Sequence, residues 1–90
     1  MLISRRGTVR DPRFTDCVQR LALAFPNASQ IIDGAIWSIE RDPKGMGVYL
    51  EALDVWQARV VRPHVLLLYC FNRRFLTMLT IIPADDSVEF

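Results

Sequence analysis

Three apolar runs of strand length fill the C-terminal third of this 90-residue chain. They span residues 55–61, 65–71 and 75–82, and the segments between them are Arg62-Pro63-His64 and Asn72-Arg73-Arg74. Connections this short join antiparallel neighbours, because a parallel pair needs a crossover of a dozen or more residues. The sequence therefore predicts a three-stranded antiparallel meander in this region.

Two helices are predicted ahead of the meander. Asp11-Pro12 is typical of a helix start, and the apolar residues that follow recur at helical spacing up to Pro26. Asn27-Ala28-Ser29 offers capping residues for a second helix, which Asp42-Pro43 ends. The short link between them indicates an αα-hairpin. We therefore expect an α+β fold, with an N-terminal helical hairpin packed on a C-terminal antiparallel β-meander.

These elements are expected to form a single domain over residues 1–90, since a chain of this length holds one core. Residues 1–10 are expected to be either an edge strand or an arm. Residues 84–90 are expected to be a tail made acidic by Asp85, Asp86 and Glu89. The segment Lys44-Gly45-Met46-Gly47 is predicted to be a turn.

Composition limits the functions that are open to the chain. Hydrophobic residues make up 51% of it, which favours a packed core, and a net charge of +1 gives no argument for a dedicated nucleic-acid-binding protein. Cys17 and Cys70 lack metal-ligand spacing, and no metal or cofactor is expected. The sequence has neither a signal-peptide pattern nor an apolar run of membrane-spanning length. We expect a cytoplasmic protein that makes no contact with membranes.

Basic side chains gather around the two predicted turns of the meander. The first turn and its strand carry Gln57, Arg59, Arg62 and His64, and the second turn carries Arg73 and Arg74. Arg binds phosphates through charge and bidentate hydrogen bonds, and His titrates near neutral pH. Two interpretations stay open for these residues: a cationic groove for phosphates, or surface arginines that are solvated or pair with acids.

The aromatic residues are expected to serve mainly in packing. Tyr69 is predicted to be a core aromatic with its hydroxyl at the sheet edge. Trp37 and Trp56 are expected to be anchors of the core or of an interface, and stacking on RNA bases is the alternative for Trp56.

Several segments, taken in order, carry a family resemblance. They are residues 14–21, the helix 31–41 ending in Asp42-Pro43, the strand Trp56-Gln57-Ala58-Arg59-Val60, and the strand Val65-Leu66-Leu67-Leu68-Tyr69. Over residues 12–82 the chain resembles the RelE/ParE superfamily of type II toxin–antitoxin toxins. The resemblance implies a helical hairpin on a twisted antiparallel sheet. In ribosome-dependent members, basic side chains on the sheet stabilise the phosphorane charge while an RNA 2′-hydroxyl attacks the adjacent phosphate.

Carried over by position, Arg59 matches a basic strand residue of that family. Gln57 stands where a second basic residue is common, and Leu66 stands where the partner strand often has Arg, so the match is degenerate at the catalytic positions. The candidate catalytic residues are Arg59, Arg62 and His64. The candidate RNA-binding residues are Gln57, Arg73 and Arg74.

Three functions are compatible with the sequence. The first is a toxin-type component of a bacterial type II toxin–antitoxin pair, acting as an mRNA endoribonuclease whose partners are a cognate antitoxin and the ribosome with its mRNA. The second is a non-enzymatic binding module of RelE/ParE type, directed at gyrase or at another protein. The third is a small scaffold domain that associates with itself as a homodimer.

Overall fold

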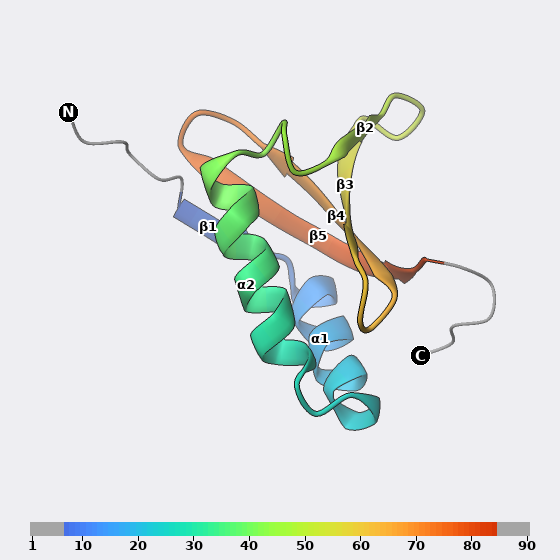
Figure 1. Ribbon diagram of the computed structural model, residues 1–90. Coiled ribbons are helices and arrows are strands. Elements are labelled where there is room, and N and C mark those ends of the chain that lie inside the picture. Colours follow the sequence, from blue (N-terminus) through green and yellow to red (C-terminus); the bar gives the residue numbers. More distant parts are fainter. Residues whose placement is uncertain (1–6, 85–90) are drawn as a thin grey trace.

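The computed structural model describes residues 7–84, which form a five-stranded sheet with two helices on one of its sides (Figure 1). In chain order the elements are β1 (Gly7–Arg10), α1 (Pro12–Ala24), α2 (Ala28–Arg41), β2 (Val48–Leu50), β3 (Val55–Val60), β4 (Val65–Phe71) and β5 (Phe75–Pro83). The strands lie across the sheet in the order β1-β5-β4-β3-β2. The first and last strands of this set are therefore neighbours.

The fold predicted from the sequence is wrong in its order of elements and in the type of its sheet. A strand, β1, precedes the helices and pairs in parallel with β5, from Gly7 opposite Phe75 to Arg10 opposite Met78. A further strand, β2, pairs antiparallel with β3. The sheet is mixed and five-stranded, in place of an antiparallel meander that follows a helical hairpin. The three strands β3, β4 and β5 form its antiparallel centre.

Both additional strands are short edge strands. Residues 7–10 form the edge strand that was one of the two alternatives expected for residues 1–10, but the sequence pattern does not reveal which strand they pair with. β1 reads Gly-Thr-Val-Arg and has no fully buried side chain, so its apolar alternation is weak. It is tied to β5 through the ladder of a parallel pair, and the long connection that such a pair needs contains both helices and the strands β2, β3 and β4. The expected acidic tail lies, from residue 85 onward, outside the described residues.

The helices begin and end for local reasons. The Asp11 carboxylate accepts a hydrogen bond from the backbone N–H of Arg13 at 2.9 Å, and Pro12 takes the first helical position. Asn27 precedes α2 without a side-chain cap bond, and Asp42 closes that helix before Pro43. With 13 and 14 residues, neither helix in the part of the chain described here is long and apolar enough to cross a membrane.

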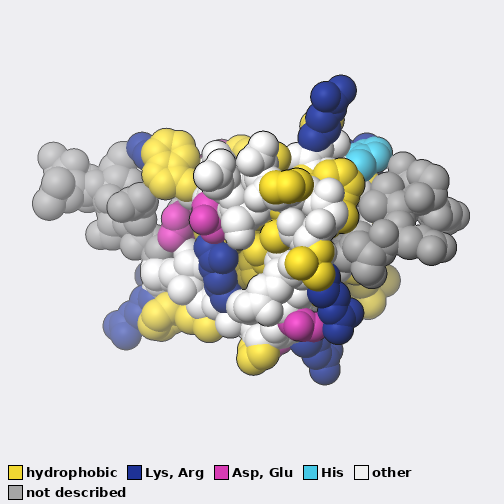
Figure 2. Space-filling view, turned by 90° about the horizontal axis from the view of Figure 1, so that it is seen from below, with side chains coloured by type: hydrophobic (Ala, Val, Ile, Leu, Met, Phe, Trp, Pro, Cys, Tyr) yellow, Lys and Arg dark blue, Asp and Glu magenta, His cyan; other side chains and the backbone are white. Residues whose placement is uncertain are grey.

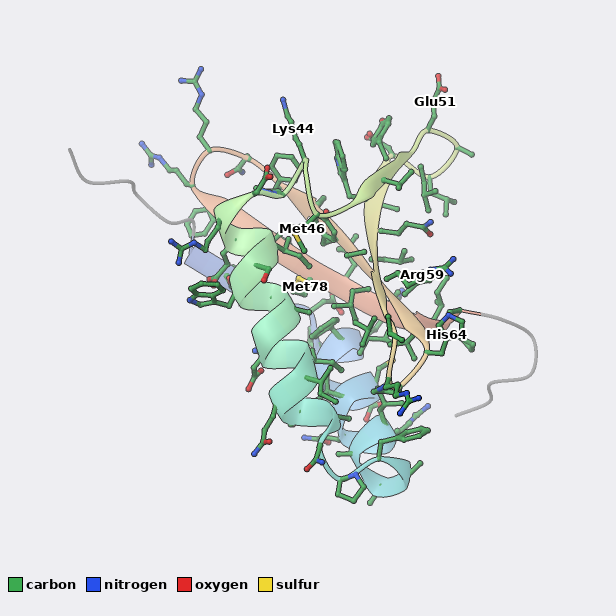
Figure 3. All side chains as sticks on the ribbon, in the orientation of Figure 1. Lys44, Met46, Glu51, Arg59, His64 and Met78 are labelled. Carbon is green, nitrogen blue, oxygen red and sulfur yellow. The ribbon has the colours of Figure 1, made fainter. Side chains whose placement is uncertain are left out.

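The core lies between the helices and one face of the sheet. Its helical side consists of the buried residues Phe14, Val18, Leu21, Ala28, Ile32, Ile36 and Ile39. Its sheet side consists of Ala58, Val60, Val65, Leu67, Tyr69, Leu76, Met78 and Ile81, among which Met78 is labelled in Figure 3. Apolar residues from both helices and from three strands thus share one cluster, and this cluster fixes the sheet relative to the helices.

The side chains between these buried residues point to the opposite face, because successive side chains of a strand alternate. No helix of residues 7–84 covers that face (Figure 1). We call it the open sheet face, and its members are Val48, Gln57, Arg59, Leu66, Leu68, Cys70, Thr77 and Ile82. It is mostly apolar, and Val48 is 61% exposed and Ile82 37% exposed.

Candidate functional site

Among residues 7–84, Arg59 is the one charged side chain of the open sheet face. It lies opposite Leu66 on β4, and Leu66 lies opposite Ile82 on β5. The neighbours of Arg59 in this cross-strand row are therefore apolar. Arg59 is exposed, and the ion pairs among the described residues join other partners. A guanidinium in this setting can make bidentate hydrogen bonds to a carboxylate or a phosphate.

A hollow of about 340 Å³ lies beside Arg59, and we call it the Arg59 hollow. Its lining residues come from the loop before β2 and from β2, β3 and β4: Gly45, Met46, Gly47, Val48, Gln57, Arg59 and Leu66. In Figure 3 the labelled Met46 lies in the loop that leads into β2, and Arg59 projects from β3. The hollow therefore combines one cation and one amide with the apolar residues Met46, Val48 and Leu66.

A hydrogen bond from Tyr69 holds the loop that lines the hollow against the sheet. The buried Tyr69 hydroxyl donates a hydrogen bond to the carbonyl oxygen of Pro43 at 2.6 Å. A Cβ at Gly47 would overlap that hydroxyl and would lie 2.8 Å from the carbonyl oxygen of Gln57. Only glycine lets the loop come this close to β3, so Gly47 and Tyr69 together set the depth of the hollow.

The environment of Tyr69 keeps its hydroxyl protonated. Burial, and to a lesser degree the negative charge of Asp42, raises the pKa of Tyr69 to about 12. The hydroxyl therefore stays a donor at neutral pH. The prediction that Tyr69 is a core aromatic is confirmed, because the residue is fully buried. Its hydroxyl reaches the loop that contains Pro43 and leads into the edge strand β2.

Arg62 and His64 lie at a different hollow from Arg59. They contribute to a groove between the α1–α2 link and the β3–β4 turn, which we call the turn groove. Its volume is about 460 Å³, and its lining residues are Phe25, Pro26, Asn27, Ala28, Ile31, Val61, Arg62, Pro63 and His64. The three candidate catalytic residues are thus close in sequence but divide between two hollows.

Figure 3 shows Arg59 and His64 at the same end of the sheet, where β3 turns into β4. The register agrees, because Val60 pairs with Val65 and the two candidates flank that pair in sequence. The backbone of His64 is fixed by its carbonyl oxygen, which accepts a hydrogen bond from the N–H of Ala84 at 3.1 Å.

Arg73 and Arg74 lie at the opposite end of the sheet. They belong to the β4–β5 turn, in which the Asn72 side chain accepts hydrogen bonds from the N–H groups of Arg74 and Phe75, both at 2.8 Å. The seven residues of β4 separate this turn from the β3–β4 turn, and at about 3.3 Å per residue this is roughly 20 Å. Of the three candidate RNA-binding residues, only Gln57 shares a hollow with Arg59.

The two tryptophans have distinct surroundings. Trp56 packs against the core, with its ring 5.4 Å from that of Tyr49 and 5.5 Å from that of Phe71, measured between centroids. Trp37 is about half exposed, and the Arg41 guanidinium lies 4.3 Å from its ring centroid. These contacts make Trp56 a packing residue and leave Trp37 on the outer surface of α2.

Sequence reasoning found Arg59 and Gln57 but missed the loop that makes the hollow. The two glycines at 45 and 47 indicate a turn, yet the sequence does not show that Gly47 must pass close to Tyr69. Among residues 7–84 there is no group of three or more His, Cys, Asp or Glu side chains that could hold a metal ion.

No family model matches the sequence, and no curated protein matches it either.

Proposed function

We propose that this chain is the toxin-type component of a bacterial type II toxin–antitoxin pair and that it acts as a binding module through its open sheet face. The observation that carries the proposal is Arg59, a single exposed cation on an apolar face that no helix of residues 7–84 covers. The sequence resemblance to RelE/ParE toxins supplies the biological setting.

The composition of this face supports a macromolecular partner. Leu66, Leu68 and Ile82 form adjacent cross-strand positions, and the exposed Val48 extends them to the edge strand β2. Exposed apolar surface of this kind, rimmed by polar groups, is typical of protein interfaces. An arginine within such a surface is a frequent energetic anchor, because a partner carboxylate or phosphate can satisfy its fixed donors.

Binding is favoured over catalysis by the placement of the candidate groups. A general acid or base must come within hydrogen-bond reach of the group that it serves. Arg59 lines one hollow while Arg62 and His64 line another. The separation supports an interaction surface in which Arg59 is an anchor.

The experiment is induction of the chain in a bacterial host, with growth, mRNA integrity and DNA damage followed together. We expect growth to stop while transcripts stay intact, and Arg59→Ala to relieve the arrest. Arg13→Ala is the matched control, because Arg13 is an exposed arginine on α1, away from the open sheet face. Normal growth after induction of the wild type would contradict the toxin assignment, and an arrest insensitive to Arg59→Ala would contradict the site.

Partner binding gives a second measurement. The product of a small adjacent reading frame, when one is present, is co-expressed and its affinity for the chain measured with purified proteins. Removal of an anchoring arginine at a buried interface costs roughly 2 kcal/mol, which corresponds to about thirtyfold in Kd. We expect that loss for Arg59→Ala and none for Arg13→Ala.

A second candidate function is mRNA cleavage, and one observation favours it: Arg59 and His64 lie at the same end of the β3–β4 pair (Figure 3). In this case induction produces new mRNA ends within the coding region, and Arg59→Ala and His64→Ala each abolish them. Growth arrest with unchanged transcript ends rules this function out and leaves the binding module.

A further inference from the structure

The turn groove has the character of a small-molecule site that is separate from the Arg59 hollow. Its floor includes the buried Ala28 and Pro63, and its walls include Phe25, Ile31 and Val61. Figure 2, which views the molecule from below, shows apolar side chains gathered beside the single histidine, His64. Exposed apolar residues around a concavity of this size are expected to gain free energy when a ligand removes them from water.

Polar groups are few in the turn groove, and of the described residues that line it only one is permanently charged. Arg62 supplies the cation, whereas Asn27 and His64 are the remaining lining residues with polar side chains. Among residues 7–84, no Asp or Glu lines the groove. The groove thus pairs a large apolar surface with positive charge, which is the complement of a ligand with an apolar tail and an anionic head.

We propose that the turn groove binds a small amphipathic monocarboxylate, with its aliphatic or aromatic tail against Phe25, Ile31 and Pro63 and its carboxylate on the Arg62 guanidinium. The volume of about 460 Å³ falls within the range of roughly 300–1,000 Å³ that is usual for such sites. Guanidinium donors match a carboxylate in a bidentate arrangement, so Arg62 selects the head group.

Two other occupants fit the groove less well. An extended peptide would bring backbone N–H and C=O groups against walls that offer almost no polar partners, and unsatisfied backbone groups are costly to bury. A second copy of the chain, docked groove to groove, would place two Arg62 side chains near each other, and no acidic residue within 7–84 lines the groove to separate them. A ligand with one negative charge avoids both difficulties.

The test is titration of the ¹⁵N-labelled full chain with octanoate, octanol and octylammonium below their micelle concentrations, followed by backbone amide shifts. We expect octanoate to shift amides at 25–31 and 61–64, octanol to bind more weakly at the same place, and octylammonium to bind weakest. In the hexanoate-to-octanoate series each buried methylene should strengthen binding by about fourfold.

Variants separate the roles of charge and groove. Arg62→Ala should weaken octanoate binding by about fivefold and leave octanol binding unchanged, as expected for an ion pair near the surface. Arg59→Ala should change neither octanoate binding nor octanol binding. Ile31→Glu places a negative charge on a wall whose residue is already 39% exposed, so the chain should fold and lose octanoate binding.

Four outcomes would overturn the proposal. Equal affinity for octanoate and octanol, or no effect of Arg62→Ala, would remove the anion selectivity. Backbone amide shifts centred on Leu66 and Ile82 would show that the amphiphile binds at the open sheet face and not in the turn groove. Binding of an acidic amphipathic helical peptide at 25–31 and 61–64, without any response to the three amphiphiles, would make the groove a protein-docking site.

Discussion

Replacement of Gly47 by alanine should destabilise the chain because the new Cβ collides with two atoms. The new Cβ would overlap the Tyr69 hydroxyl and approach the Gln57 carbonyl oxygen to 2.8 Å. Neither atom can move freely, because the hydroxyl donates to Pro43 at 2.6 Å and the carbonyl belongs to β3. The loop must therefore lift away from the sheet.

The cost follows from what the lifted loop loses. A buried hydrogen bond to Pro43 is broken and its carbonyl left without a partner, which costs about 1–2 kcal/mol. Strain from the forced shift adds about 1 kcal/mol. We expect a loss of about 2–3 kcal/mol in the free energy of unfolding, or roughly 10–20 °C in Tm. Urea denaturation followed by tryptophan fluorescence measures it.

The chain offers a matched control for the same chemical change. Gly34 lies within α2, and a Cβ there would meet nothing within 4 Å. Gly34→Ala should stabilise the protein by about 0.5–1 kcal/mol, because alanine is the better helix former. In a Tyr69→Phe background the cost of Gly47→Ala should fall by about 1 kcal/mol, since the hydroxyl is absent. Wild-type stability of Gly47→Ala, or strict additivity with Tyr69→Phe, would refute this account of the loop.

Three further predictions concern stability. The raised pKa of Tyr69 means that its stabilising effect is complete below pH 10 and is lost as pH rises towards about 12. In that window the wild type should lose stability relative to Tyr69→Phe in urea titrations, by no more than about 1.4 kcal/mol per pH unit, and parallel curves would contradict it. Asp11→Ala should cost about 1 kcal/mol by thermal unfolding, whereas Asn27→Ala should cost less, because only the Asp11 side chain caps its helix. Leu21→Ala should cost about 2–5 kcal/mol in denaturant, whereas Leu23→Ala should change stability by less than about 0.5 kcal/mol, since Leu21 is fully buried and Leu23 is 88% exposed.

The helices and the central strands were predictable because each leaves a strong local pattern. Asp11 and Pro12 mark the start of α1, and Asp42 and Pro43 mark the end of α2, at the positions found in the structure. The long apolar runs likewise produce β3, β4 and β5. Helix capping and the alternation of side chains depend on residues that are neighbours in sequence. A single sequence therefore contains the information that is needed to place these helices and strands.

The partners of the edge strands and the mixed topology were not predictable from the same patterns. β1 and β2 have four and three residues, and each is defined by backbone pairing with a strand elsewhere in the sheet. The β1 pairing with β5 joins Gly7 to Phe75 across most of the chain. Nothing in four mostly polar residues specifies so distant a partner.

The candidate site was predictable only where it depends on local alternation along a strand. Alternation along β3 correctly places Gln57 and Arg59 on one face. It does not determine which way a turn directs its side chains, so Arg62 and His64 were expected beside Arg59 although they line another groove. The depth of the Arg59 hollow depends on the close packing of Gly47 against Tyr69. This is a contact between segments that are distant in sequence.

The parallel pairing of β1 with β5 also has a consequence for biosynthesis. As the ribosome releases the chain from its N-terminal side, residues 7–10 emerge before their partner, residues 75–78, has been made. The sheet can therefore close only late in translation, after both helices are out and the chain has formed its longest loop. Until then β1 has an unpaired backbone that is open to chaperones and to other nascent chains, and a ribosome stalled before residue 75 would hold the protein in that incomplete state.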